Sequence, residues 1–312
     1  MEHIAILQVV IPLVLAPLCL VIPRYAWLIA FFGSLAALCC AIVILLAVLG
    51  VGDIVYVLGG WAPPWGISLH IDLLGGYILL LVTLVATLVV VWAHDSVSSE
   101  IQEDQINLFW CMFLLCLTGS LGIVATGDAF NVFVFLEIAS LSTYSLIALG
   151  RDRRALMASF QYLIMGTVGA TFILISIGLL YMMTGTLNMV DLASRLPELR
   201  DTTTVQAAFA FFTVGVSLKI ALFPVHQWLP NAYTYAPSTV TVFLAATSTK
   251  ISLYVLLRFF YTVFGSGYAF DDLNVDYILL PLSILAIFVS SMIAVFQKDL
   301  KKILAYSSVA QI

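Results

Sequence analysis

The feature that most constrains this chain is a succession of uninterrupted apolar runs of about twenty residues, separated by short polar breaks. An α-helix of roughly 20 apolar residues is long enough to cross a bilayer. Hydrophobic residues make up 63% of the sequence and charged residues 9%, whereas a soluble domain carries about 25% charged residues. In lipid only helices and closed barrels satisfy the backbone, and the continuous runs exclude the alternation of a barrel. The sequence therefore predicts an all-α, polytopic transmembrane helix bundle.

The apolar runs give about nine complete spans and the start of a tenth near Ile303. The expected spans are 4–22, 26–50, 73–93, 107–124, 129–149, 156–183, 205–222, 238–262 and 277–296. Glycines and prolines mark the connection 51–72 as an irregular surface excursion, and 184–204 is polar enough to lie outside the bilayer. Because the last helix stops about two turns after it begins, we expect this chain to be a piece of a longer or split protein.

Basic residues predict the orientation. Seven follow odd-numbered spans (Arg24, Arg151, Arg153, Arg154, Lys298, Lys301 and Lys302), and three lie on the opposite side (Arg195, Arg200 and Arg258). Since basic loops stay in the cytoplasm, the N-terminus is expected outside, in a bacterial inner or plasma membrane.

Three charges lie inside predicted spans and cannot be placed in a loop or at a membrane surface: Glu137, Lys219 and Lys250. Each costs about 2.5–3.5 kcal/mol at a helix centre on insertion scales, so such residues usually have a function. Burial favours the neutral form of a lysine and a nearby carboxylate favours the charged form, so a moving partner can switch its protonation. These residues are therefore candidates for proton translocation. The competing interpretation is that Glu137 and Lys219 form an ion pair that only joins two helices.

Two polar stripes accompany these charges. At helical spacing, Glu137 shares a face with Ser140 and Tyr144, and Lys250 shares a face with Thr247 and Tyr254. Such stripes line a hydrated path or hydrogen-bond to neighbouring helices. We therefore treat the four uncharged residues as candidate path residues.

Proline residues predict a broken helix near residues 219–237. Pro224, Pro230 and Pro237 interrupt a run at membrane depth, where unwound backbone is tolerated only inside protein or beside water. Transporters place ion sites at such breaks. His226 lies in this segment, and a role in the proton path and a role as a packing or capping residue both stay open.

These residues resemble the antiporter-like subunits shared by respiratory complex I and the Mrp-type Na⁺/H⁺ antiporters, and the D-type subunit of the Mrp antiporter most of all. The resemblance rests on Lys219, the segment Phe223–Asn231, Ala236-Pro237, Phe135-Leu136-Glu137, Lys250 and the segment Asp299–Ser308, in the family's order. It implies that Glu137 modulates Lys219, that Lys219 carries the proton, and that Lys250 passes it on. Asn231 stands where many family members have an acid, so any role of that acid is missing here.

The resemblance also implies a domain organisation. Residues 1–100 form an N-terminal three-helix segment, 107–262 a first five-helix repeat that translocates protons, and 277–312 the beginning of an inverted second repeat. The later broken helix of the family and its exit route lie beyond these residues.

The leading hypothesis is a proton-translocating subunit of a multisubunit cation (Na⁺)/proton antiporter. The alternatives are a membrane-arm subunit of complex I or a membrane-bound hydrogenase, and a non-conducting membrane scaffold. The expected partners are other membrane subunits, protons, Na⁺ and the lipid bilayer, with no nucleic acid. The sequence has no metal cluster, nucleophile motif or phosphate loop, so we expect a transporter subunit without a cofactor rather than an enzyme.

Overall fold

The computed structural model describes residues 3–312, and this part of the chain contains nine helices long and apolar enough to cross a membrane. They are α1 (Ile4–Val21), α2 (Ala26–Val51), α3 (Leu73–Glu100), α4 (Ile106–Ala125), α5 (Ala129–Ala148), α6 (Arg153–Thr184), α8 (Thr203–Ile220), α10 (Ser238–Arg258) and α11 (Asp276–Val295). A twelve-residue helix, α12 (Leu300–Gln311), follows. The polytopic helical bundle expected from the sequence is confirmed.

Shorter elements join or extend these helices. Two of them, α7 (Met189–Arg195) and α9 (Trp228–Tyr235), are short α-helices. The single-turn elements are η1 (Pro23–Tyr25), η2 (Leu58–Gly60), η3 (Glu103–Gln105), η4 (Leu196–Leu199), η5 (Phe259–Val263) and η6 (Gly267–Asp272), the last two being π-helical.

The expectation of an irregular excursion at 51–72 is wrong in part. Strands β1 (Ile54–Val57) and β2 (Ser68–Ile71) pair antiparallel in this connection, with Ile54 opposite Ile71 and Val57 opposite Ser68. The Gly- and Pro-rich residues between them form the tip. Gly127 donates its backbone N–H to the carbonyl of Ser68 at 2.9 Å, which fixes the hairpin against the turn between α4 and α5.

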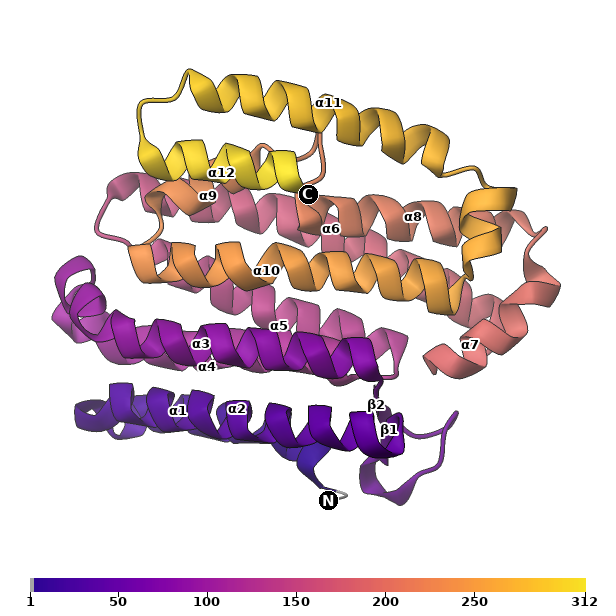
Figure 1. The fold of residues 1–312 in the computed structure, drawn as a ribbon, viewed down its shortest axis with the longest axis horizontal. Helices are drawn as coiled ribbons and strands as arrows, with labels where there is room; N and C mark the ends of the chain where they lie inside the picture. The colour runs from indigo at the N-terminus through magenta and orange to yellow at the C-terminus, as the bar shows by residue number, and fades with distance from the viewer. Residues whose placement is uncertain (1–2) are drawn as a thin grey trace.

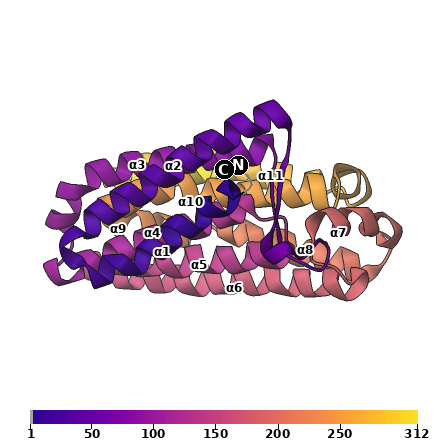
Figure 2. The same cartoon turned by 90° about the horizontal axis from the view of Figure 1, so that it is seen from below.

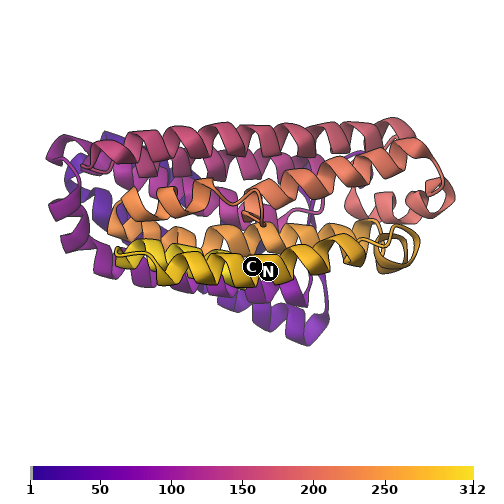
Figure 3. The same cartoon turned by 90° about the horizontal axis from the view of Figure 1, so that it is seen from above.

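The helices lie nearly parallel in successive layers. In Figure 1 the layer of α1 and α2 is followed by α3 and α4, then α5 and α10, then α6, α8 and α9, with α11 and α12 on the far side. Figure 2 shows the face formed by α1 and α2, with the β-hairpin at one end of the bundle. Figure 3 shows the opposite face, where α11 and α12 run along one part and α6 and α8 are visible beside them. The site described below lies among the inner layers.

Polar side chains cap several helix starts. The carboxylate of Asp72 accepts from the N–H of Gly75 at α3, and that of Asp128 accepts from the N–H of Asn131 at α5. Asp152 at α6 and Asp299 at α12 cap in the same way. An acidic cap satisfies free backbone N–H groups and complements the helix dipole, so these residues fix where the spans begin.

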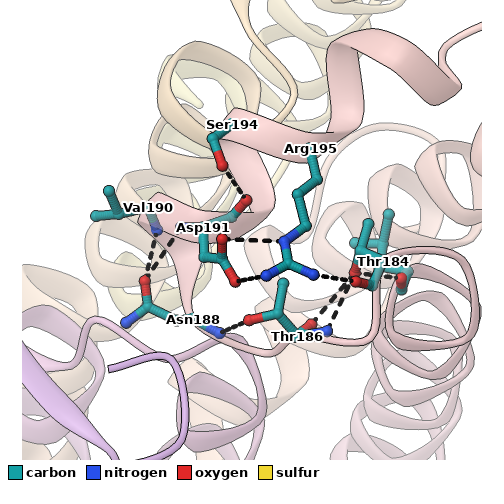
Figure 4. A network of polar contacts seen from close by, with 8 residues as sticks. Thr184, Thr186, Asn188, Val190, Asp191, Ser194 and Arg195 are labelled. Carbon is teal, nitrogen blue, oxygen red and sulfur yellow. Dashed lines mark hydrogen bonds and ion pairs between the residues drawn. The ribbon is translucent and has the colours of Figure 1, made fainter. Parts of the chain in front are cut away.

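The connection between α6 and α8 is ordered by a polar network (Figure 4). The Asn188 side chain accepts from the N–H groups of Val190 and Asp191, which starts α7. Arg195 pairs with Asp191 at 2.8 Å and donates to the carbonyl of Thr184 at 2.9 Å. These bonds tie α7 back to the end of α6.

Candidate functional site

Lys219 stands at the end of a helix that breaks. α8 ends at Ile220, and Ala221 follows in the left-handed region with φ 63° and ψ 43°. The chain then crosses a non-helical turn and resumes as α9 at Trp228. Pro224 lies in the turn, Pro230 in the first turn of α9, and Pro237 directly before α10. The predicted broken helix is confirmed.

Trp228 supplies a second donor to a carbonyl at the break, which already accepts from the backbone N–H of Ala221 at 3.3 Å. Its indole Nε1 donates a 3.0 Å hydrogen bond to the carbonyl of Leu218. Its ring stacks on Tyr162 of α6 with 4.0 Å between centroids and an interplanar angle of 1°. The break is thereby attached to α6 through two aromatic rings.

The Lys219 amine contacts two of the three polar residues that the helical spacing selected on α5, and Tyr144 is not among them. Its Nζ lies 3.3 Å from Glu137 Oε1 and donates to Ser140 Oγ at 2.8 Å. The Lys219 side chain is 3% exposed and that of Glu137 is 23% exposed. A fully buried amine with one carboxylate and one hydroxyl partner is expensive to bury and sensitive to any movement of that carboxylate.

α6 sets the spacing of the two helices that carry this pair. It approaches α8 at Gly169 and Gly215, where a Cβ on Gly169 would lie 2.9 Å from the Gly215 carbonyl oxygen. It approaches α5 at Gly166, where a Cβ would overlap the hydroxyl of Tyr144. Only glycine allows such contacts. Tyr144 thus packs into α6 beside the pair, and its ring lies edge-on to Tyr162 at 4.7 Å.

A small cavity of about 20 Å³ adjoins Lys219. Since a water molecule needs roughly 10–15 Å³ measured this way, the cavity has room for one. Beside Lys219 and Ser140, its polar lining comes from four helices: Cys116 and Ser120 of α4, Thr143 of α5, Tyr162 of α6, and Thr247, Ser248 and Ser252 of α10. Of these only Ser140, Thr247 and Lys219 were singled out from the sequence. The others are hydroxyls and a thiol of ordinary helical residues, and only the arrangement of α4, α5, α6 and α10 around Lys219 identifies them.

Lys250 does not point into this cavity. Thr247 and Tyr254 are buried at 2% and 4% exposure, whereas the Lys250 side chain is exposed and its Nζ donates to the carbonyl of Ala245 at 2.7 Å. Lys250 lies at the edge of the buried face of α10. Leu257, two helical turns further along the same helix, is exposed as well. Within residues 3–312 no carboxylate lies within ion-pair distance of it.

His226 lies in the turn between α8 and α9 and is buried. Its ring stacks on Phe223 at 5.3 Å and lies edge-on to Tyr306 of α12 at 6.4 Å. Its Nδ1 has no hydrogen-bond partner in the described part of the chain. The residue therefore joins the broken helix to α12, and the sequence alone did not indicate this neighbour.

A second charged pair, which the sequence reasoning did not find, joins α3 to α10. Arg258 Nη1 and Nη2 donate to both oxygens of Asp72 at 2.8 and 2.7 Å, and the same guanidinium donates to the hydroxyl of Tyr254. That hydroxyl donates to the carbonyl of Val124 in α4 at 3.2 Å. Partial burial acts to raise the pKa of Asp72, but the bonds from Arg258 and from the Gly75 N–H hold it below its usual value. A separation of 186 residues hides this pair from any local pattern.

Comparison with known proteins decides the family. The model of the family described as NADH:quinone oxidoreductase/Mrp antiporter, TM matches residues 126–312. This chain belongs to that NADH:quinone oxidoreductase/Mrp antiporter family. The matched region contains Glu137, Lys219 and Lys250, and it begins at the end of α4. The resemblance inferred from the sequence is therefore confirmed at the level of the family.

Individual family members differ in the complex that they serve. NADH-quinone oxidoreductase subunit N of Desulforudis audaxviator is 45% identical over 82% of this chain and 50% of its own length. The D-type subunit of the Na(+)/H(+) antiporter of Alkalihalophilus pseudofirmus is 30% identical over 100% of this chain and 62% of its own length. A chain of the membrane-bound sulfane sulfur reductase, an archaeal respiratory membrane complex, superposes with a TM-score of 0.91 at 32% identity, covering 99% of this chain and 63% of that one. This chain thus spans about half to two thirds of the length of these family members.

Proposed function

We propose that this chain is the proton-translocating subunit of a multisubunit monovalent cation (Na⁺)/proton antiporter, with Lys219 as the proton carrier. The observation that carries the proposal is the buried Lys219 amine held by Glu137 and Ser140 at the end of a broken helix. Membership of the family and the similarity of the whole chain to a D-type Na(+)/H(+) antiporter subunit support it.

The pair provides a switch. With Glu137 in contact, the carboxylate stabilises the ammonium form of Lys219, and the Ser140 hydroxyl oxygen accepts a hydrogen bond from it. When Glu137 moves away, burial disfavours the charge and the amine releases a proton. The N–H bond breaks, the nitrogen keeps the electron pair, and the proton passes to a hydroxyl or water in the adjoining cavity.

The cavity gives the direction of the next step. On the α10 side it is lined by Thr247, Ser248 and Ser252 together with Ile251, and Lys250 belongs to the same helix segment. A proton leaving Lys219 would cross from α8 to α10 through these hydroxyls. The neutral amine of Lys250 would accept it after breaking its bond to the Ala245 carbonyl. Lys250 would thus move the proton sideways along the bundle.

A second candidate places the same relay in a redox-driven complex. NADH-quinone oxidoreductase subunit N of D. audaxviator has the higher identity, 45%, which favours a membrane-arm subunit of such an enzyme. In that case electron transfer on other chains drives the protons, and this chain carries out no redox step. In both cases its partners are other membrane subunits.

Proton transport in everted membrane vesicles tests the proposal. The full-length gene is expressed in its operon as wild type, Glu137→Ala or Lys219→Ala, and Na⁺ and NADH are added separately. We expect a Na⁺-dependent proton signal that both substitutions abolish. A signal that needs NADH instead would assign the chain to a redox complex.

Matched controls separate chemistry from assembly. Glu103→Ala and Lys302→Ala remove the same charges at partly or fully exposed positions outside the pair. Quantities of assembled complex are compared by immunoblot. Intact transport in Glu137→Ala and Lys219→Ala would show that the pair is a structural ion pair. It would support the alternative that this chain is a non-conducting membrane scaffold.

A further inference from the structure

The turn between α9 and α10 is held by opposite charges from two different helices. On one side, the backbone N–H of Ser238, the first residue of α10, donates to Glu100 Oε2 at 2.6 Å. On the other side, Lys301 Nζ donates to the carbonyl of Ala236, the C-cap residue of α9, at 3.1 Å. Glu100 ends α3 and Lys301 lies in the first turn of α12. These ends lie together at one end of the bundle (Figure 1).

Each charge matches the helix end that it contacts. A carboxylate at the N-terminus of α10 and an ammonium group at the C-terminus of α9 both complement the helix dipoles. Ser238 has no acceptor within its own helix, because the first N–H groups of a helix are free. Pro237 between the two contacts has no N–H to donate. Glu100 and Lys301 therefore satisfy groups that the turn itself leaves without partners.

The remaining charges around the turn come from the connection between α5 and α6. The guanidinium of Arg154 stacks on Tyr235 at 4.6 Å and pairs with Asp152 at 2.7 Å. Arg151 donates to the carbonyl of Ile101 at 2.9 Å. A cavity of about 290 Å³, lined by Glu100, Arg151, Asp152 and Lys301, lies over the turn. Its volume shows that the turn is not packed tightly from outside, so the two charged contacts limit its movement.

The turn connects the two elements of the proposed relay. α9 is joined to Lys219 by the turn 221–227, and α10 carries the hydroxyls that face Lys219 and also Lys250. α12 contacts this unit at a second point, where Tyr306 lies against His226. A displacement of α12 would therefore be transmitted to both ends of α9.

We propose that Glu100 and Lys301 are positioning residues that hold the α9–α10 turn and couple α12 to the Lys219 site. The proposal rests on the proposed function of that site. Removing either contact releases the turn and lets α9 shift along the long axis of the bundle. This shift separates Lys219 from the hydroxyls of α10. Neither residue accepts the transported proton.

The test compares Lys301→Gln, Lys301→Arg and Lys302→Gln in the complete complex. Deuterium exchange of the peptide 228–242 is measured together with proton transport in vesicles. We expect Lys301→Gln to accelerate exchange at least about tenfold, because a hydrogen bond from a charged donor is lost, and to slow transport. Lys301→Arg should restore both, because its guanidinium can reach the same carbonyl. Lys302→Gln should change neither, since within residues 3–312 its side chain makes no hydrogen bond with the turn.

A second pair of variants tests the other side of the turn. Glu100→Ala should accelerate exchange at the start of α10, whereas Glu103→Ala should not. Unchanged exchange in both Lys301→Gln and Glu100→Ala would overturn the coupling. Faster exchange in those variants would support the role of the two contacts. If transport also survived Lys219→Ala, the proposed function of Lys219 would be refuted while the role of the contacts stood. The two failures are therefore distinguishable.

Discussion

The indole nitrogen of Trp228 donates to the carbonyl oxygen of Leu218, the residue directly before Lys219. This bond spans the break, since Leu218 belongs to α8 and Trp228 begins α9. That carbonyl also accepts from the backbone N–H of Ala221 at 3.3 Å, so the helix that follows supplies a second donor across the break. The position of Lys219 is set by the same side chain that stacks on Tyr162.

Trp228→Phe keeps an aromatic ring on Tyr162 and removes the donor. We expect the Leu218 carbonyl to lose one of its two donors and to keep the Ala221 N–H, at a cost of about 0.5–1.5 kcal/mol. The complex should melt at a lower temperature and transport protons more slowly. Trp61→Phe is the control, because Trp61 is 71% exposed in the hairpin connection. Equal melting temperatures for the two variants would contradict the role of the bond.

Gly169→Ala tests the spacing of α6 and α8. The added methyl group would lie 2.9 Å from the Gly215 carbonyl oxygen and 3.1 Å from Leu218 Cβ, so one helix must shift. Overpacking of this kind costs about 1–3 kcal/mol, and the shift displaces Lys219 from Glu137. We expect reduced thermal stability and reduced transport. Gly178→Ala on the same helix meets nothing within 4 Å and should behave as wild type.

Ser140→Ala removes the hydroxyl that accepts from the Lys219 amine at 2.8 Å. A hydrogen bond to a charged group contributes about 1.5–3 kcal/mol, and about 1.4 kcal/mol corresponds to a tenfold change in rate. We expect transport at least about tenfold slower, measured in vesicles with equal amounts of complex. Ser142→Ala is matched, because within residues 3–312 the buried Ser142 hydroxyl bonds only to the Ile138 carbonyl of its own helix. Comparable rates in the two variants would remove Ser140 from the site.

The Asp72–Arg258 pair predicts a pH dependence of stability. Its net effect is to lower the pKa of Asp72, so the unfolded chain binds this proton more readily than the folded chain. The contribution to stability is complete above the usual pKa of an aspartate and is lost as pH falls through the lowered value. Thermal melting in detergent at decreasing pH should show this loss in wild type and less of it in Asp72→Asn. Asp276→Asn, at an exposed position on α11, should retain the wild-type pH dependence.

The spans could be predicted from the sequence because each apolar run has to satisfy its own backbone in lipid. The expected limits 129–149 and 277–296 differ from α5 and α11 by no more than one residue at each end. The break after Lys219 could be predicted because proline cannot continue a helix. The contact of Glu137 and Ser140 with Lys219 agrees with the helical spacing on α5, although whether these residues carry protons stays a prediction.

The remainder depends on packing that no local pattern contains. The β-hairpin at 54–71 consists of two four-residue strands in a segment rich in Gly and Pro, where the strand signal is short. The cavity beside Lys219 collects hydroxyls from several helices, each ordinary in its own segment. Lys250 shares a helical face with Thr247 and Tyr254, but it lies at the edge of that face and extends outward. The division into repeats and the orientation of the N-terminus stay predictions.

Ala221 adopts a backbone conformation that glycine accepts readily and alanine does not. The left-handed region costs an L-residue with a Cβ about 1–2 kcal/mol, and here the surrounding bonds of the break impose it. Ala221→Gly would lower that strain, yet it would also widen the range of angles that the chain can adopt after Lys219. Alanine at this position is therefore strained, but it allows fewer backbone conformations than glycine would. The bend after Lys219 is already present in this structure, so no proton is needed to form it.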